Sequence, residues 1–139
     1  MSARIAFIGF GEAGQAMAAG LREDGISEIA AWDILFPESS GANLIEAANT
    51  SGVRVASSAA DAVRDADIVI AAVTAASSHE AAQSVVGHLA GKPLYLDVNS
   101  VSPGRKQATA KLLDERARYV DVAIVSAIHP ARHKSPMML

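Results

Sequence analysis

The sequence contains no cysteine, and this absence limits the chemistry that is open to it. Without cysteine the chain has neither a disulfide framework nor a cysteine-ligated metal site. Histidine offers little in its place. His129 and His133 have the spacing of two metal ligands on one helix face, but Pro130 disfavours a helix there. We therefore expect no metal, and the lack of cysteine leaves the redox compartment open.

Basic clusters and long apolar runs are also missing. The 12 lysine and arginine residues are dispersed among 15 acidic residues, which gives a formal net charge of −3. A surface that binds nucleic acid would be expected to carry a clustered basic face. A membrane helix would need an apolar run of about 18 residues. We expect no nucleic-acid partner, no membrane association and a cytoplasmic location.

Aromatic residues are few, at 4%, while half of the residues are hydrophobic and alanine is abundant. This hydrophobic share excludes a disordered chain and fits a sheet that is buried on both faces. Small alanine side chains let helices lie close to such a sheet. Because 139 residues are the size of one typical domain, we expect residues 1–139 to form a single unit.

Strand and helix patterns alternate along the whole chain. The expected strands are Arg4–Ile8, Glu28–Trp32, Val53–Ala56, Asp67–Val73, Leu94–Val98 and Tyr119–Val125. The expected helices are Ala13–Glu23, Ala42–Ala48, a segment capped by Ser58 that carries Ala59, Ala62, Val63 and Ala66, a segment from a Ser77–Glu80 capping box to Leu89, and one from Pro103, capped by Ser102, to Ala117. Residues 36–41 are expected to be a loop, and the apolar segment Met137–Leu139 to begin a further strand. This alternation predicts an α/β fold, a doubly wound, mostly parallel Rossmann sheet with helices on both faces.

The first strand leads directly into a glycine-rich motif, Gly9-Phe10-Gly11-Glu12-Ala13-Gly14. In this pattern the first glycine makes the tight turn, the second lets the backbone approach a pyrophosphate, and the third lets the helix pack closely on the strand. The free N–H groups of the first helical turn then receive the negative charge. We expect these six residues to bind a dinucleotide. A strand-to-helix turn without a ligand is the alternative interpretation.

An acidic residue follows at the end of the second strand. Asp33 lies 19 residues beyond Gly14, where a carboxylate accepts hydrogen bonds from the adenosine ribose and repels a 2′-phosphate. No arginine follows it immediately. We expect NAD as the cofactor and consider NADP less favoured. A solvated aspartate at a strand end is the alternative.

Polar residues follow the later strands at the edge where ligands of parallel sheets bind. We expect Val73 and Thr74, after the fourth strand, to contact the cofactor. Asn99 and Ser100 follow the fifth strand and would face the cofactor and substrate cleft, unless they merely shape a turn. Ser126 would meet Asn99 from the end of the sixth strand, whereas Asp121, inside that strand, is interpreted as structural.

Three segments together resemble the β-hydroxyacid dehydrogenase superfamily, which includes 6-phosphogluconate and 3-hydroxyisobutyrate dehydrogenases. They are Gly9–Gly14, Asp97-Val-Asn-Ser100 with Pro103, and Asp121-Val-Ala-Ile-Val-Ser126. The form of the first two is most similar to a phosphogluconate dehydrogenase-like, NAD-binding branch. The resemblance covers essentially the whole chain.

The resemblance implies roles for individual residues. Asn99 would touch the nicotinamide ribose or the substrate, Ser100 the substrate, and Ser126 the acid group of the substrate. Ala127 and Ile128 stand where the family has two glycines, so the substrate is expected to differ from a simple hydroxy acid.

The family's catalytic lysine lies on a helix beyond Leu139. Neither Lys111 nor Lys134 matches its motif, so the catalytic residue is unknown within this chain. The helical carboxyl-terminal domain that completes the active site and usually forms the homodimer is absent as well. The resemblance therefore implies the amino-terminal cofactor domain of a larger dehydrogenase.

Two functions follow from these observations. The first is an NAD(P)-dependent oxidoreductase that moves a hydride to or from a small hydroxy acid in the full-length enzyme, with residues 1–139 alone inactive. The second is a free-standing NAD-sensing module without catalysis. Polar residues after both the fifth and the sixth strand favour the first.

Overall fold

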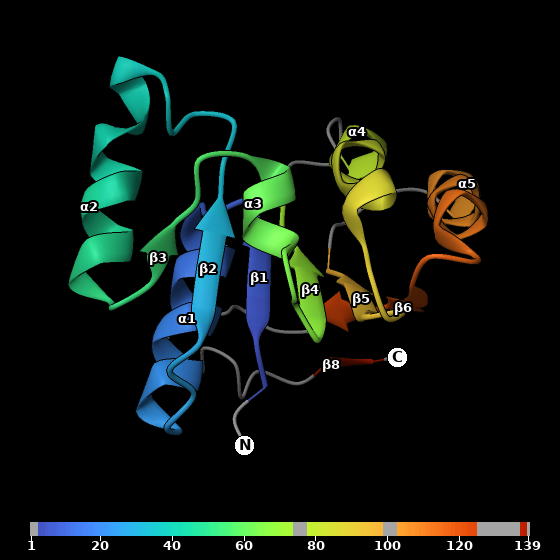
Figure 1. The fold of residues 1–139 in the computed structure, drawn as a ribbon, viewed down its shortest axis with the longest axis horizontal. Coiled ribbons are helices and arrows are strands. Elements are labelled where there is room, and N and C mark those ends of the chain that lie inside the picture. The colour runs from blue at the N-terminus through green and yellow to red at the C-terminus, as the bar shows by residue number, and fades with distance from the viewer. Residues whose placement is uncertain (1–2, 74–77, 99–102, 125–136, 139) are drawn as a thin grey trace.

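The computed structural model describes residues 3–73, 78–98, 103–124 and 137–138. Its main feature is a parallel sheet of six strands, with the order β3-β2-β1-β4-β5-β6 from left to right in Figure 1. The strands are β1 (Ile5–Ile8), β2 (Ile29–Trp32), β3 (Arg54–Val55), β4 (Ile68–Ala71), β5 (Leu94–Asp97) and β6 (Arg118–Asp121). This is the strand order of a Rossmann sheet. The chain adds strands to one side of β1 up to β3 and then to its other side from β4 onward, so the topological switch point lies between β1 and β4.

Helices cover both faces of this sheet. They are α1 (Glu12–Glu23), α2 (Ala42–Thr50), α3 (Ala59–Val63), α4 (Ser78–Val85) and α5 (Pro103–Leu113). Met17 of α1 and Ala48 of α2 belong to one buried cluster, whereas Val63, Val85 and Leu113 of α3, α4 and α5 belong to another. The predicted doubly wound α/β fold is confirmed.

Burial on both faces of the sheet explains why the sequences of the central strands are continuously apolar. In β1, Ile5 and Phe7 join the cluster under α1, while Ala6 and Ile8 join the cluster under α3. Successive side chains of a strand point to opposite faces, so a strand covered on both sides needs apolar residues at every position. All four residues of β1 are accordingly buried.

Several helix ends differ from the expectation. Helix α3 stops at Val63 rather than reaching Ala66, because Asp65 adopts a left-handed conformation with φ of 59°. Helix α4 ends at Val85 and gives way to a 3-10 helix at Val86–His88. Helix α5 ends at Leu113, four residues short of the predicted end, and a turn follows it. In these three segments the residues that favour a helix continue beyond the point where the helix ends.

The beginnings of the helices agree better with the sequence. The Ser58 hydroxyl accepts the Asp61 N–H at 3.0 Å, as expected of a helix cap. Helix α2 starts at Ala42 as predicted and runs on to Thr50, while the predicted loop before it contains a 3-10 helix at Ser39–Gly41. The other two predicted caps, Ser77 and Ser102, lie outside the described residues.

The sixth strand is shorter than predicted. It leaves the sheet after Asp121, and Ala123–Ile124 form β7, which pairs antiparallel with β8 (Met137–Met138). Its last ladder contact is the Val122 N–H donating to the Asp97 carbonyl at 2.9 Å. The predicted parallel strand is therefore wrong beyond Asp121, and its predicted last residue, Val125, lies outside the described residues.

The apolar segment at the end of the sequence was expected to begin a strand. Met137 and Met138 do form one, although it pairs antiparallel with β7 and does not join the main sheet. Leu139, the last residue of that segment, lies outside the described residues. The expectation is therefore confirmed for two residues of the three and stays a prediction for Leu139.

Within the described ranges, no helix is long and apolar enough to cross a membrane. The cytoplasmic location stays a prediction.

Candidate functional site

The glycine motif forms the connection between β1 and α1, at the carboxyl edge of the sheet. Gly9 has φ of +95°, and a side chain there would overlap the Ala72 carbonyl and approach the Val73 Cγ1 to 2.7 Å. A side chain at Gly14 would lie 2.8 Å from the Gly9 carbonyl oxygen. Both glycines are therefore required by the fold, because the loop packs against the end of β4 and α1 packs against the loop.

Gly11 has a different environment. Its backbone is extended, with φ of −74° and ψ of −159°, and no atom of the described residues lies within 4 Å of the position of an added Cβ. Gly11 also precedes the first residue of α1, and in the described part of the chain no side chain caps this helix. The first-turn N–H groups of a helix lack intrahelical partners and attract anions. The open space at Gly11 is thus a place where a phosphate group can reach the helix end.

Asp33 lies beside this loop at the end of β2. Its Oδ2 accepts the Phe10 N–H at 2.8 Å, and its Oδ1 accepts the Leu35 N–H at 2.9 Å. The two bonds hold the half-buried carboxylate in a set orientation next to the glycine loop. The Phe10 side chain is buried in an edge-to-face contact with Phe7, so Phe10 can offer a ligand only its backbone.

The chain after Asp33 turns sharply. The Phe36 N–H donates to the Asp33 carbonyl at 2.9 Å, and the Phe36 ring packs edge-on against Trp32. Between these anchors, Ile34 is 70% exposed although it is a large apolar residue. The turn thus holds an apolar side chain in solvent directly beside the carboxylate.

The structure brings only some of the predicted site residues together. Gly9, Gly11, Glu12, Ala13 and Gly14 form the loop and the first turn of α1, with Asp33 and Val73 beside the loop. Thr74, Asn99, Ser100 and Ser126 lie outside the described residues, so their expected roles stay predictions. The same holds for His129 and His133. In the residues that are described, no group of His, Asp and Glu could hold a metal ion.

None of the described residues is assigned the role of the family's catalytic lysine. The resemblance places the family's lysine beyond Leu139, and Leu139 itself lies outside the described residues. The structure therefore gives no test of that expectation, and the position of the catalytic lysine stays a prediction.

A buried polar cluster at the end of β5 was missed by the sequence reasoning. The Asp97 carboxylate is 1% exposed and accepts the Tyr119 hydroxyl at 2.6 Å. Lys106 of α5 is 8% exposed; its Nζ lies 3.5 Å from the Asp97 Oδ1 and donates to the Asp97 carbonyl at 3.1 Å. The sequence held one signal: Lys106, Thr109 and Leu113 are spaced three and four residues apart, so they share one helix face. In the structure all three are buried.

A second tyrosine, Tyr95, packs against this cluster. Its ring stacks on that of Tyr119, with ring centroids 6.1 Å apart. The Tyr95 hydroxyl is fully buried and, among the described residues, has no hydrogen-bond partner. Burial, together with the negative charge of Asp97, raises the pKa of Tyr95 well above its usual value. This hydroxyl therefore stays protonated.

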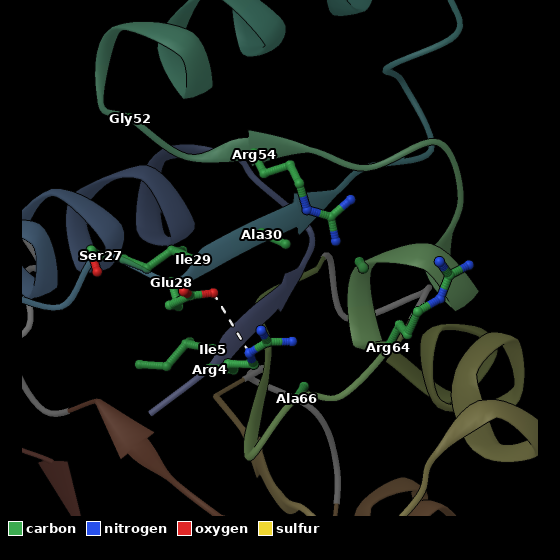
Figure 2. Close-up of a pocket in the computed structure, with 11 residues that line it drawn as sticks. Arg4, Ile5, Ser27, Glu28, Ile29, Ala30, Gly52, Arg54, Arg64 and Ala66 are labelled. Carbon is green, nitrogen blue, oxygen red and sulfur yellow. Dashed lines mark ion pairs between the residues drawn. The ribbon is translucent and has the colours of Figure 1, made fainter. Parts of the chain in front are cut away.

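A hollow of about 260 Å³ lies at the opposite, amino-terminal edge of the sheet (Figure 2). Arg4, Arg54 and Arg64 line it, but each is paired with a carboxylate. Arg4 lies 3.6 Å from Glu28, and Arg54 lies 2.9 Å from Asp61. Ligands of open parallel sheets bind at the carboxyl edge. We therefore place the functional site at the glycine loop and not in this hollow.

Comparison with known proteins gives a consistent result. The sequence model of the family described as "NADP oxidoreductase coenzyme F420-dependent" matches residues 4–100. Among curated proteins, an uncharacterised 28.5 kDa protein of Methanothermus fervidus is 33% identical over 125 residues, which are 90% of this chain and 46% of that protein.

Two solved structures are similar over nearly the whole chain. A conserved hypothetical protein from Sinorhizobium meliloti superposes with a TM-score of 0.90 at 31% identity, covering 99% of this chain and 46% of that one. A conserved protein of unknown function, described as structurally similar to 3-hydroxyacid dehydrogenases, superposes with a TM-score of 0.78 at 32% identity, covering 92% and 46%. This chain spans about half the length of the relatives that it matches.

Proposed function

Because the chain belongs to the family described as NADP oxidoreductase, coenzyme F420-dependent, we propose that it is the NAD(H)-binding domain of a dehydrogenase that acts on a small hydroxy acid. The coarser part of this statement is established: the chain is an NAD(P)-binding, Rossmann-type oxidoreductase domain, and its resemblance to the β-hydroxyacid dehydrogenase superfamily is confirmed. The choice of NAD and the hydroxy acid substrate are the proposal.

One observation carries the nucleotide part of the proposal. Of the three glycines in the motif, Gly9 and Gly14 are needed for packing, whereas no atom of the described residues lies within 4 Å of a side chain added at Gly11. The fold alone gives no reason for glycine there. A ligand that approaches the backbone does, and the uncapped start of α1 suits a pyrophosphate.

The turn after β2 supports NAD over NADP. Residues 33–38 read Asp-Ile-Leu-Phe-Pro-Glu, with two carboxylates and neither lysine nor arginine. A 2′-phosphate on the adenosine ribose would meet the Asp33 charge, and this turn offers it no cation. The family's description names NADP, so this chain would differ from its family's name in the cofactor that it prefers.

Each part of the chain has a stated task in this proposal. The glycine loop binds the pyrophosphate, and Asp33 accepts hydrogen bonds from the adenosine ribose. Bound nicotinamide would supply the hydride chemistry, and the protein orients it. The resemblance assigns the substrate to Asn99, Ser100 and Ser126.

The rest of the proposed enzyme lies outside these 139 residues. Since the relatives are about twice as long, we propose that a general acid/base lysine and a helical dimerisation domain follow Leu139 in the full-length protein. Proton transfer by such a lysine would complement the hydride step.

Calorimetric titration with NAD and NADP tests the proposal. We expect NAD to bind more tightly, and Asp33→Ser to lower the affinity for NAD by about tenfold, since hydrogen bonds to a charged group are worth roughly 1.5–3 kcal/mol. Asp33→Asn, which keeps an acceptor for the loop but loses the charge, should mainly relax the discrimination against NADP. Equal or reversed affinity of the wild-type protein would overturn the NAD assignment, and no binding of either would overturn the function.

A further inference from the structure

The buried Asp97–Lys106 pair has no task in the function proposed above. It joins the last residue of β5 to the first half of α5, and Tyr119 of β6 donates a further hydrogen bond to the same carboxylate. Taking two charges out of water costs several kcal/mol per ion, so such a pair is a poor way to stabilise a fold. Apolar residues of similar size would pack there at least as well. A role for this pair must therefore come from where it lies in the fold and not from the stability that it adds.

The strand order gives that position. Asp33 at the end of β2 places the adenosine on one side of the glycine loop, and the loop itself follows β1. The other half of a dinucleotide must then extend over β4 and β5. Neighbouring strands are about 4.8 Å apart, so the end of β5 lies about 10 Å from the end of β1, roughly the reach of a nicotinamide nucleoside. Asp97 thus lies beneath the expected nicotinamide position.

The charge of this ring differs between the two redox forms. Oxidised nicotinamide carries one positive charge on the ring, and reduced nicotinamide carries none. A buried carboxylate beneath this ring would favour the oxidised form; for an assumed separation of about 10 Å and an effective dielectric constant of about 20, the preference is roughly tenfold. A neighbouring ammonium group cancels this preference.

We propose that Lys106 is a positioning residue that acts through Asp97: it neutralises the buried carboxylate and so keeps the affinities for the oxidised and the reduced cofactor balanced. This inference rests on the proposed nicotinamide binding. It does not require Lys106 to touch the cofactor or the substrate. It predicts opposite effects for the loss of each partner, which a purely structural pair would not produce.

The measured quantity is the ratio of the dissociation constants for NADH and NAD. Lys106→Met removes the positive charge of the pair and should shift this ratio up to tenfold in favour of NAD. Asp97→Asn removes the negative charge and should shift it in the opposite direction. The double variant Asp97→Asn/Lys106→Met and the conservative Lys106→Arg should both keep the wild-type ratio.

A matched control is available at the other edge of the sheet. Arg54 forms an ion pair with Asp61 at 2.9 Å beside β3, and β2, β1 and β4 separate β3 from β5 in the sheet, so Arg54→Met should leave the ratio unchanged. If Lys106→Met fails to fold, Asp97→Asn decides alone, because its amide still accepts the Tyr119 hydroxyl. Single variants that fold and keep the wild-type ratio over the pH range in which they are stable would overturn the inference, as would two shifts in the same direction. A wild-type protein that binds neither form would instead overturn the proposed function.

Discussion

Gly9 and Gly11 are identical residues two positions apart, yet they are glycine for different reasons. Gly9 is constrained by the protein, because its φ is positive and the Ala72 carbonyl occupies the place of a side chain. Among the described residues, nothing constrains Gly11. The proposed nucleotide would account for it, so the two glycines separate a requirement of folding from a proposed requirement of binding.

This contrast gives a direct test. Gly11→Val should abolish or strongly weaken cofactor binding while changing the free energy of unfolding by less than about 1 kcal/mol, because the backbone there suits any residue. Gly9→Ala should instead cost at least about 1–3 kcal/mol from backbone strain alone. Calorimetry and urea unfolding measure the two effects. A folded Gly11→Val protein with wild-type affinity would remove the argument from the glycine loop.

The two stacked tyrosines make another residue-level comparison. Tyr119→Phe removes a hydrogen bond to the buried Asp97 carboxylate and should lower the free energy of unfolding by about 1.5–3 kcal/mol. Tyr95→Phe removes a hydroxyl without a described partner and should be neutral or stabilising. Urea unfolding of both variants checks this. Equal destabilisation would mean that the Tyr95 hydroxyl has a partner after all.

At the level of elements, the start of α3 is tied to β3 through one carboxylate. Asp61 accepts the Ser57 N–H at 2.9 Å and forms an ion pair with Arg54. The backbone hydrogen bond from Ser57 and the charge and hydrogen bond of Arg54 lower the pKa of Asp61 below its usual value of 3.8. The ionised carboxylate therefore holds the start of α3 and β3 together, and protonation weakens both interactions.

This arrangement predicts a pH dependence. Because the pKa of Asp61 is lower in the folded state, its contribution to stability is present above the ordinary pKa of an aspartate and is lost as the pH falls through the folded value. Asp61→Asn should therefore be less stable than the wild type near neutral pH, and the difference should shrink in acid. Thermal unfolding at both pH values measures it, and a difference that does not depend on pH would contradict the prediction.

The strands and helices themselves differ in how well their sequences predicted them. All six parallel strands were predicted, although only β1, β2 and β4 are apolar over their whole length, while β3, β5 and β6 contain Arg54, Asp97 and Arg118. The ends of α3, α4 and α5 were placed too late, since alanine-rich runs are compatible with both a helix and the turn that follows it. The break after β6 at Asp121 had no local signal, because the apolar residues 122–125 continue the strand pattern in the sequence while Asp121 is the last residue that pairs with β5.

At the level of the whole molecule, the chain holds only one part of the proposed site. It spans about half of its relatives, and the resemblance assigns the catalytic lysine to the part beyond Leu139. We predict that residues 1–139 bind the cofactor but do not oxidise hydroxy acids, since loss of general acid/base catalysis alone costs about 10²–10⁴ in rate. The formation of reduced nicotinamide with a panel of 2- and 3-hydroxy acids tests this. Robust turnover would place the acid/base within these residues.

The sequence by itself determined the fold and the binding motif, because both are written in local patterns. Continuous apolar segments, glycine spacing and an acidic residue after β2 are each read within a few neighbouring positions. They predicted the six strands, the helices on both faces, the glycine loop and the place of Asp33.

Only the tertiary structure decided which of these residues the packing of the protein itself requires. Gly9 and Gly11 look alike in the sequence, and they differ only because the end of β4 lies against one of them. Asp97 is joined to Lys106 and Tyr119 across 9 and 22 positions of sequence, through three separate elements. Such contacts depend on how strands and helices are stacked, and no local pattern along the chain records that.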